Sequence, residues 1–367
     1  MRTLAKPVFM KVKAEQDLFI SLRQQVMEVV AALEAKRWWT IKAKTILFPL
    51  LYVAAYAGAL LWGSNIGVLY ICYFLLGCFL LLNFLNLIHD AVHHTLFKQP
   101  WLNRMYVYFF DIMGANSYMW KIRHIRLHHN YPNVMGWDSD FEQSPMARVF
   151  PHGAYSVMHR YQHFYLPLLY PLYLFNWLLV RDYKDFFIKS RLVWKVNQHI
   201  PAIEYVKLFL FKIFFLLYTI VIPKVVLGIS WAQIFIAFLI MMFTASIISL
   251  VVLLSPHATP ESEFPLPDEK GMLPDTWFRH QLATTNDVIS DSWFIRFFMG
   301  SFNYHIAHHL FPHINHVYYP EVTTVIEAFA KKHQLPYRTF TLSHSLFNHY
   351  RLLKANAVYE NLFEETM

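Results

Sequence analysis

Four long apolar runs, arranged as two closely spaced pairs, constrain the fold of this chain more than any other feature. The runs cover about 46–62, 68–88, 206–226 and 231–254. Each approaches or exceeds the roughly 20 residues that a helix needs to cross a hydrocarbon core of about 30 Å. The linkers within the pairs, at 63–67 and 223–230, are too short to form domains. The sequence therefore predicts two membrane-spanning helical hairpins.

The low content of charged residues supports this prediction. Only 15% of the 367 residues are charged, whereas about a quarter is usual in a soluble domain. We therefore expect an all-α integral membrane protein with four transmembrane helices rather than two soluble domains. The expected parts are a cytoplasmic N-terminal amphipathic helix within 1–45, a membrane domain over 46–354 and a C-terminal tail at 355–367.

A fifth apolar stretch, 164–180, differs from the other four because it contains Pro167 and Pro171. Each proline removes a backbone hydrogen bond from a helix. We expect this stretch to lie at the membrane interface, as a helix or a re-entrant segment, without crossing the bilayer.

The distribution of Lys and Arg predicts the orientation in the membrane. Residues 1–45 contain nine of the 32 basic residues, the linker 63–67 contains none, and the linker 223–230 contains only Lys224. Cytoplasmic segments are enriched in Lys and Arg, and the N-terminus does not resemble a secretory signal. The N-terminus, the segment 89–204 and the residues after 255 are therefore expected in the cytoplasm, on the same face as the histidine clusters.

Histidine is unusually frequent, with 20 in the chain, and the candidates for a shared site fall into three clusters and one single position. The clusters read HDAVHH, HIRLHHN and HIAHHL, and the single histidine follows the fourth apolar run. Spacings of three and four residues place side chains on one face of a helix. The nine candidate metal ligands are His89, His93, His124, His128, His129, His257, His305, His308 and His309.

Nine imidazoles exceed what one metal ion takes. A structural zinc ion has about four protein ligands and a catalytic one about three, and neutral imidazole also suits iron and copper. The set therefore predicts a site for two metal ions in a helical cytoplasmic cap. Cys72 and Cys78 lie within an apolar run, which argues against a thiolate site and against a disulfide framework.

Several neighbouring residues are expected to assist the ligands. His94 is adjacent to His93 but points away from it on a helix, so it is a weaker candidate ligand. Asp90, Asp138 and Asp140 are candidates for hydrogen bonds to the outer nitrogens of ligating imidazoles, although the last two would equally suit a solvated loop.

The segments HDAVHH, HIRLHHNYPN and HIAHHLFPHINHVYYP resemble the three histidine boxes of the membrane fatty acid desaturase family. The resemblance covers nearly the whole chain, from about residue 20 to about residue 320. It also includes GWDSD at 136–140, SEFPLPDE at 262–269 and HQLATTN at 280–286, and is most similar to the bacterial acyl-CoA and linoleoyl-CoA desaturases.

The resemblance implies two iron ions held almost entirely by histidine, with dioxygen as co-substrate, in an enzyme that introduces a double bond into an acyl chain. It also implies that the nine candidate histidines are the ligands and that the bacterial inner membrane is the location. His280 and His316 match family positions outside the boxes, where supporting roles are expected. The chain departs from the family pattern at Ile125, at Pro132 and around His257, and His305 stands where some members have Gln, so the substrate stays open.

The reaction implied by the resemblance needs electrons from outside, because the sequence contains no nucleotide, flavin, iron–sulfur or haem motif. The expected partners are an external ferredoxin or small b-type cytochrome, membrane lipid, and an acyl substrate carried by coenzyme A, a carrier protein or a lipid. The net charge of +8 is not arranged as a nucleic-acid-binding stripe, so no nucleic acid is expected.

Two alternatives remain at this point. The same histidine cage is compatible with hydroxylation or ketolation of a lipid or carotenoid. A metal-binding membrane transporter is more distant, because transporters place their ligands near the middle of the bilayer, whereas these histidines lie outside the apolar runs.

Overall fold

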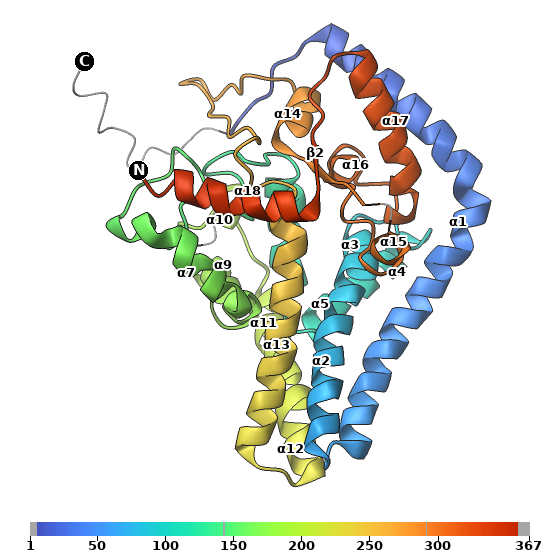
Figure 1. Ribbon diagram of the computed structural model, residues 1–367, viewed down its shortest axis with the longest axis vertical. Coiled ribbons are helices and arrows are strands. Elements are labelled where there is room, and N and C mark those ends of the chain that lie inside the picture. Colours follow the sequence, from blue (N-terminus) through green and yellow to red (C-terminus); the bar gives the residue numbers. More distant parts are fainter. Residues whose placement is uncertain (1–5, 142–143, 291, 359–367) are drawn as a thin grey trace.

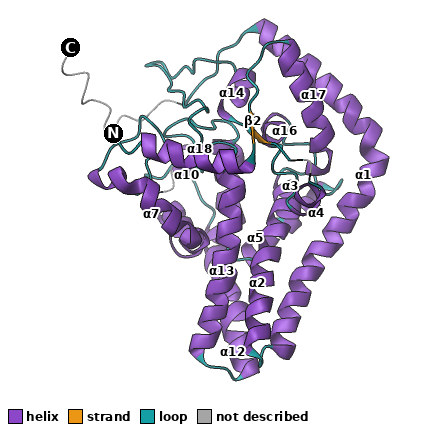
Figure 2. Ribbon diagram, in the orientation of Figure 1, coloured by secondary structure: helices purple, strands orange, loops and turns teal. Residues whose placement is uncertain are grey.

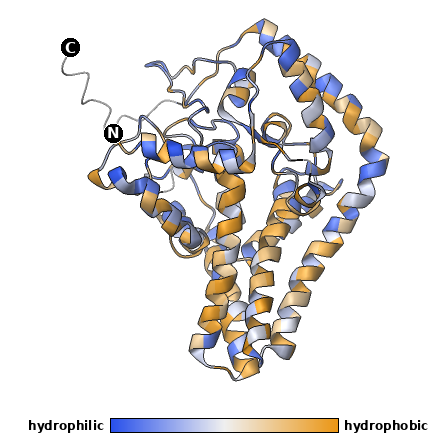
Figure 3. Cartoon of the chain, viewed as in Figure 1, coloured by the Kyte–Doolittle hydropathy of each residue, from blue (hydrophilic) through white to orange (hydrophobic). Residues whose placement is uncertain are grey.

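The computed structural model describes residues 6–141, 144–290 and 292–358. Residues 1–5 of the expected N-terminal part and 359–367 of the expected tail lie outside the described residues. A stalk of long helices supports a wider cap of shorter helices (Figures 1 and 2). The lower part of the stalk is mostly apolar, whereas the cap mixes polar and apolar residues (Figure 3).

The four expected spans correspond to the long helices of the stalk. The helix α2 continues without interruption through a π-helical turn, η1, into α3, and α11 continues in the same way through η6 into α12. The bounds are α1 Lys13–Trp62, α2 Ile66–Asn83, η1 Phe84–Ile88, α3 His89–Val92, α11 Ala202–Leu216, η6 Leu217–Val221, α12 Ile222–Leu227 and α13 Trp231–Leu254.

The N-terminal amphipathic helix and the first span form one continuous helix. α1 has 50 residues, with Pro49 inside it. Its N-terminal part packs on the cap through Leu22 and Val26, and its C-terminal part packs in the stalk through Tyr52 and Ala59. The helix therefore connects the cap to the far end of the stalk.

Local residues explain the tight turns at the far end of the stalk. The side chain of Asn65 accepts hydrogen bonds from the amides of Gly67 and Val68 at the start of α2. Ser230 and Gln233 form a reciprocal capping box at the start of α13. These caps satisfy amide groups that have no partner within the helix.

The stretch with two prolines folds into a chain of short helices. In Figure 1, α7 and α9 do not run alongside α2 and α13. The whole segment, Val157–Phe187, is one of five in the described residues that are long and apolar enough to cross a membrane. Its elements are η3 Val157–Tyr161, α7 Gln162–Leu169, η4 Tyr170–Leu172, α8 Tyr173–Asn176, η5 Trp177–Arg181 and α9 Asp182–Phe187.

The remaining elements build the cap and its edges. Two short parallel strands, β1 and β2, pair Asp287 with Thr339 and Val288 with Phe340. The bounds are α4 Pro100–Tyr106, α5 Tyr108–Ile112, α6 Ser117–Lys121, η2 Ile122–His128, α10 Val193–Val196, α14 Trp277–Thr284, β1 Asp287–Val288, α15 Trp293–Phe298, α16 His305–Leu310, η7 His316–Tyr318, α17 Tyr319–Lys332, β2 Thr339–Phe340 and α18 Leu342–Ala355.

Gly77 is a point of close approach between α2 and α13. A Cβ atom at this position would lie 2.5 Å from the carbonyl oxygen of Met241 and 2.9 Å from Cβ of Thr244. The absence of a side chain therefore lets the two helices pack backbone to backbone, as small residues do in membrane helix pairs.

We expect Gly77→Ala to lower the stability of the protein, because the added methyl group must push α13 away from α2. Overpacking of this kind typically costs about 1–3 kcal/mol. Thermal unfolding of the purified protein in detergent measures the effect. The control is Gly67→Ala, where the nearest neighbour of the new methyl group is a side-chain oxygen at 3.3 Å. Equal melting temperatures for the two variants would contradict this packing argument.

Candidate metal centre

Four segments bring the nine candidate histidines together where the stalk meets the cap. His89 and His93 lie at the two ends of the last turn of the α2–α3 helix, and His257 follows the end of α13. The second and third clusters lie on η2 and α16 and directly after η2. All nine side chains except that of His93 are buried.

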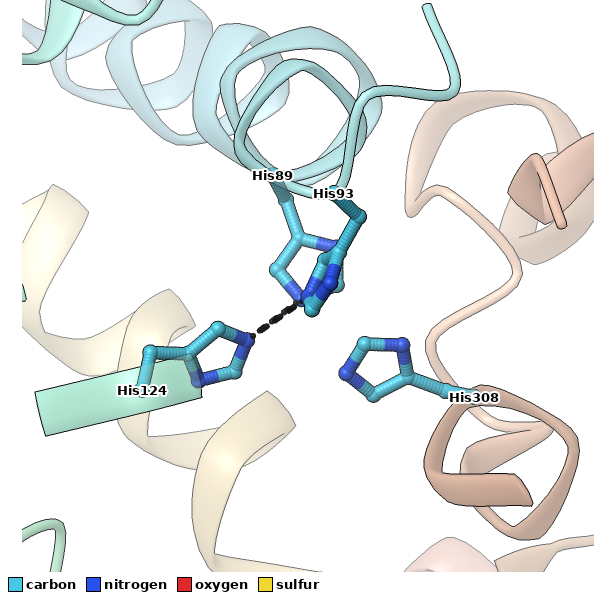
Figure 4. Close-up of side chains that lie close together, drawn as sticks. All are labelled: His89, His93, His124 and His308. Carbon is cyan, nitrogen blue, oxygen red and sulfur yellow. Dashed lines mark hydrogen bonds between the residues drawn. The ribbon is translucent and has the colours of Figure 1, made fainter. Parts of the chain in front are cut away.

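Eight of the nine histidines form two groups of four. The first group is His89, His93, His124 and His308, and the second is His128, His257, His305 and His309. Within each group, one nitrogen from every ring lies within 4.8 Å of those of the others. In Figure 4, His89 and His93 extend from one helix, His124 approaches from the left and His308 from the right, and the four rings gather around a common centre.

A π-helical turn brings two histidines of the second cluster together. His124 and His128 are four residues apart and share one face of the helix, where their rings stack with centres 5.8 Å apart. In η2 the amide of His129 donates to the carbonyl of His124, 2.9 Å away and five residues back. This wider turn places Nε2 of His129 3.1 Å from Nε2 of His124, while His124 and His128 belong to adjacent groups. π-helical turns are frequently found at functional sites.

The outer nitrogens of several rings are held by fixed partners. Nδ1 of His128 lies 3.1 Å from both carboxylate oxygens of Asp138, and Nδ1 of His124 lies 3.7 Å from Asp140. Both aspartates lie beside these outer nitrogens, and Asp138 is fully buried, but their role in supporting metal ligands stays a prediction. Such partners fix the orientation of a ligating imidazole.

Three further partners were not recognised from the sequence. Nδ1 of His309 lies 3.0 Å from Oε1 of Gln281, and Nδ1 of His257 lies 3.1 Å from the carbonyl oxygen of Thr284. Nδ1 of His308 lies 3.3 Å from the hydroxyl of Tyr319. Gln281 and Thr284 belong to the HQLATTN motif and Tyr319 to the HIAHHLFPHINHVYYP segment, so the motifs marked the positions without indicating their contacts.

The Nε2 atoms within each group face one another, and there are too few N–H protons for all of them to form hydrogen bonds with each other. Nε2 of His124 lies 3.2 Å from Nε2 of both His89 and His93, and Nε2 of His257 lies 2.9 Å from that of His305. Nε2 of His308 is buried and has no hydrogen-bond partner among the described residues. Where Nδ1 donates outward, the facing Nε2 lone pairs repel unless a cation lies between them. The geometry therefore fits metal ions in both groups.

Burial favours the neutral form that a metal ion requires. Burial lowers the pKa of His305, His308 and His309 well below the ordinary 6.5, and neighbouring imidazoles lower it further. His128 is different: burial lowers its pKa, but the carboxylates of Asp138 and Asp140 together more than offset this effect and raise the pKa above 6.5. Neutral imidazole binds a metal ion through its free lone pair.

His129 occupies a position between the two groups. Its Nε2 lies 3.1 Å from Nε2 of His124, and its ring centre lies 4.5 Å from that of His308 and 4.7 Å from that of His309. Its role as the ninth ligand stays a prediction.

The other histidines named from the sequence lie outside both groups. His94 is exposed and has a left-handed backbone with φ of 61°. His280 contacts the carbonyl of Pro132 at 3.0 Å. His316 contacts Lys44 at 2.8 Å and Asp90 at 2.6 Å, so Asp90 holds a histidine outside the groups rather than a candidate ligand.

A largely apolar cavity of about 430 Å³ adjoins the two groups. His89, His124, His128, His257 and His305 form part of its wall. Most of the rest of the wall comes from α2, η1, α5, α6, α11, α13, α18 and the short helices from α7 to η5, and loop residues such as Phe141 and Phe302 complete it. A pocket that is mostly apolar with a few convergent polar groups is typical of a ligand site.

Comparison with known proteins agrees with this geometry. The family model described as "Fatty acid desaturase" matches residues 64–341. The chain belongs to the fatty acid desaturase family. An sn-1 linoleoyl-lipid 6-desaturase of Synechocystis sp. is 30% identical over 77% of this chain and 80% of its own length. An sn-1 linoleoyl-lipid 6-desaturase of Arthrospira platensis is 31% identical over 66% of this chain and 65% of its own. An acyl-lipid (8-3)-desaturase of Physcomitrium patens is 29% identical over 83% of this chain and 63% of its own.

A buried network of charges holds the second histidine cluster of this desaturase. Arg123, fully buried and next to His124, pairs with Asp182 at 3.2 Å and with Asp185 at 2.5 Å. Asp182 also pairs with Lys212 of α11 at 2.7 Å. The network fastens η2 to α9 and to the stalk, because a buried charge left without its partner costs several kcal/mol.

We expect His308→Ala to lower the metal content of the purified desaturase by about half, because it removes one ligand from the first group and leaves the second intact. His94→Ala is the matched control and should retain the full content, since His94 belongs to neither group. Elemental analysis measures the metal content of both variants, which are purified in buffers of the same ionic strength. Full metal content in the His308 variant would contradict this assignment.

Proposed function

We propose that the enzyme introduces a double bond into the acyl chain of a membrane lipid, at a pair of iron ions held by the nine histidines. The observation that carries the proposal is the apolar cavity whose wall includes histidines of both groups. The relatives are named for acyl-lipid substrates, which favours a lipid-linked chain over a coenzyme A or carrier-protein thioester.

Iron suits the donor set and the family. Imidazole nitrogens bind first-row metals well, and iron supplies the dioxygen chemistry that breaks unactivated C–H bonds. The acyl chain loses two hydrogen atoms, an external carrier supplies two electrons, two protons come from water, and dioxygen leaves as two molecules of water.

The protein itself contributes position and exclusion of water. The outer partners Asp138, Gln281 and Tyr319 orient the imidazoles, so that metal ions held by the two groups would lie beside the cavity. The aromatic walls hold the chain and keep bulk water out, which limits side reactions of a strong oxidant. Phe84, Phe110 and Trp120 line the cavity close to His89 and His124.

We further propose four membrane spans with the cap in the cytoplasm. Each metal group combines histidines that precede Val157–Phe187 with histidines that follow it. If that segment crossed the membrane once, in addition to the other four helices, these two sets of histidines would lie on opposite sides of the bilayer. The basic residues concentrate in 1–45 and are sparse in the far linkers, as expected for a cytoplasmic cap. A bacterial inner membrane fits this orientation.

The electron donor is proposed to be a small external protein, a ferredoxin or a b-type cytochrome. The sequence contains no motif for a redox cofactor of its own besides the histidines. The net charge of +8 favours association with an acidic carrier.

Hydroxylation is the second candidate, because the same metal pair and cavity suit removal of the first hydrogen in both reactions. The names of the relatives favour desaturation. Desaturation removes two hydrogens from the chain, whereas hydroxylation adds one oxygen, so product mass separates the two.

The test is lipid analysis of a host that expresses the chain. We expect new lipids that are two hydrogens lighter than their precursors, and their loss with His309→Ala, because that variant removes a ligand of the second group. His344→Ala, an exposed histidine of α18, is the matched control and should retain activity. Products with an added oxygen would indicate the hydroxylase, and an unchanged lipid profile in a host with adequate iron and electron donor would refute both.

A further inference from the structure

The cavity runs along the end of α13 nearest the cap. Residues of α13 from Met242 to Leu254 contribute to its wall, and twelve helical steps correspond to about 18 Å. At its outer end the wall includes side chains that are also exposed on the surface, Met146 and Leu172 among them. The cavity therefore reaches the surface beside η4.

The segment Val157–Phe187 forms a wall, one layer of backbone thick, between the cavity and the exterior. On its inner side, Leu166, Tyr170 and Trp177 line the cavity. On its outer side, Phe164 is 61% exposed and Leu168 is 79% exposed. Such a large exposed apolar surface is unfavourable in water and favourable against acyl chains.

The two prolines weaken the wall at one place. Pro167 and Pro171 flank Leu169, Tyr170 and the start of η4, and neither proline has an amide to donate to the helix. Beyond this point the chain is secured again, because the amide of Leu174 donates to Oγ of Ser246 on α13 at 3.1 Å. The turn therefore lies between a proline break and a fixed point.

A side-chain hydrogen bond holds this turn against the C-terminal helix. The hydroxyl of Tyr170 lies 2.5 Å from Nε2 of His349 on α18, and Nδ1 of His349 lies 3.3 Å from the carbonyl oxygen of Ala258. With Nδ1 donating to that carbonyl, Tyr170 donates to Nε2. Both side chains line the cavity, so the bond bridges two of its walls.

We propose that the acyl chain of a membrane lipid enters the cavity sideways from the bilayer, past the turn Tyr170–Leu172, and that the Tyr170–His349 hydrogen bond latches this turn closed. The inference rests on the proposed acyl-lipid substrate. A lipid that stays in its leaflet can then place its chain beside the metal groups while its head group remains at the membrane surface.

The route is tested with a phospholipid that carries a photoreactive diazirine on its acyl chain, in vesicles containing the metal-loaded full-length protein. Cys72 and Cys78 are replaced by Ala in all samples. Illumination labels residues next to the probe, and peptide mass spectrometry compares Met242 in the cavity wall with Ile236 on the outer face of α13. This readout does not depend on turnover.

A bulky maleimide attached at Leu172→Cys is expected to lower the labelling of Met242 several-fold and to leave that of Ile236 unchanged. The matched control is Leu168→Cys, which is more exposed and does not line the cavity, so the same reagent should have no effect there. Undiminished labelling of Met242 in the blocked Leu172 variant would overturn the lateral route. A water-soluble acyl thioester probe that labels Met242 better than the phospholipid would overturn it as well.

The latch is tested with Tyr170→Phe, which removes the hydroxyl and keeps the ring. We expect Met242 to be labelled several-fold faster after the probe is added. Tyr205→Phe, which also loses one hydrogen bond, to the carbonyl oxygen of Phe186, but does not line the cavity, should match the parent protein. Equal rates for all three proteins would overturn the latch.

Two outcomes bear on the proposed function instead. Absence of cavity labelling in the parent protein would refute the proposed acyl cavity itself, whereas labelling without any desaturated product would refute the proposed reaction alone.

Discussion

The ion pairs between Arg123 and the carboxylates Asp182 and Asp185 secure the part of the molecule that carries the second histidine cluster. These groups are almost completely buried, so each charge depends on its partners for stabilisation that water would otherwise give. Lys212 extends the network to α11. The stalk, the wall of the cavity and the metal groups are therefore coupled, and none of the three can be displaced without exposing or isolating a charge.

The electrostatics of the metal groups are the reverse of those of this ion-pair network. Charged groups in the network pair with their opposites, whereas the imidazoles face one another with like lone pairs. Fixed outer partners such as Asp138 and Gln281 prevent the rings from turning away. A protein that holds ligands in a mutually repulsive arrangement before the metal arrives gains selectivity and affinity once a cation occupies the centre.

The sequence was sufficient for the helical membrane architecture because apolar length and charge distribution act locally. Residues 231–254 were expected as a span, and α13 has these bounds. The assignment of histidines to two centres was not accessible, because His124 and His128 share one helix face and only the packing of distant segments around them places them in different groups. The outer partners Thr284 and Tyr319 were also inaccessible, since contacts through a carbonyl or across distant segments leave no periodic pattern. The stretch 164–180 was singled out by its prolines, but its role as a cavity wall depends on which face packs against α13.

The long helix α1 couples the cap to the membrane-facing stalk. The path along its 50 residues is about 75 Å, more than twice the thickness of a hydrocarbon core of about 30 Å, and the helix changes direction part-way along this path (Figure 1). One part packs on the cap and the other in the stalk, so the same helix contributes to the position of the cap above the stalk. A lipid whose head group stays at the membrane surface would then meet the metal groups at a depth that depends on how the cap sits on the stalk.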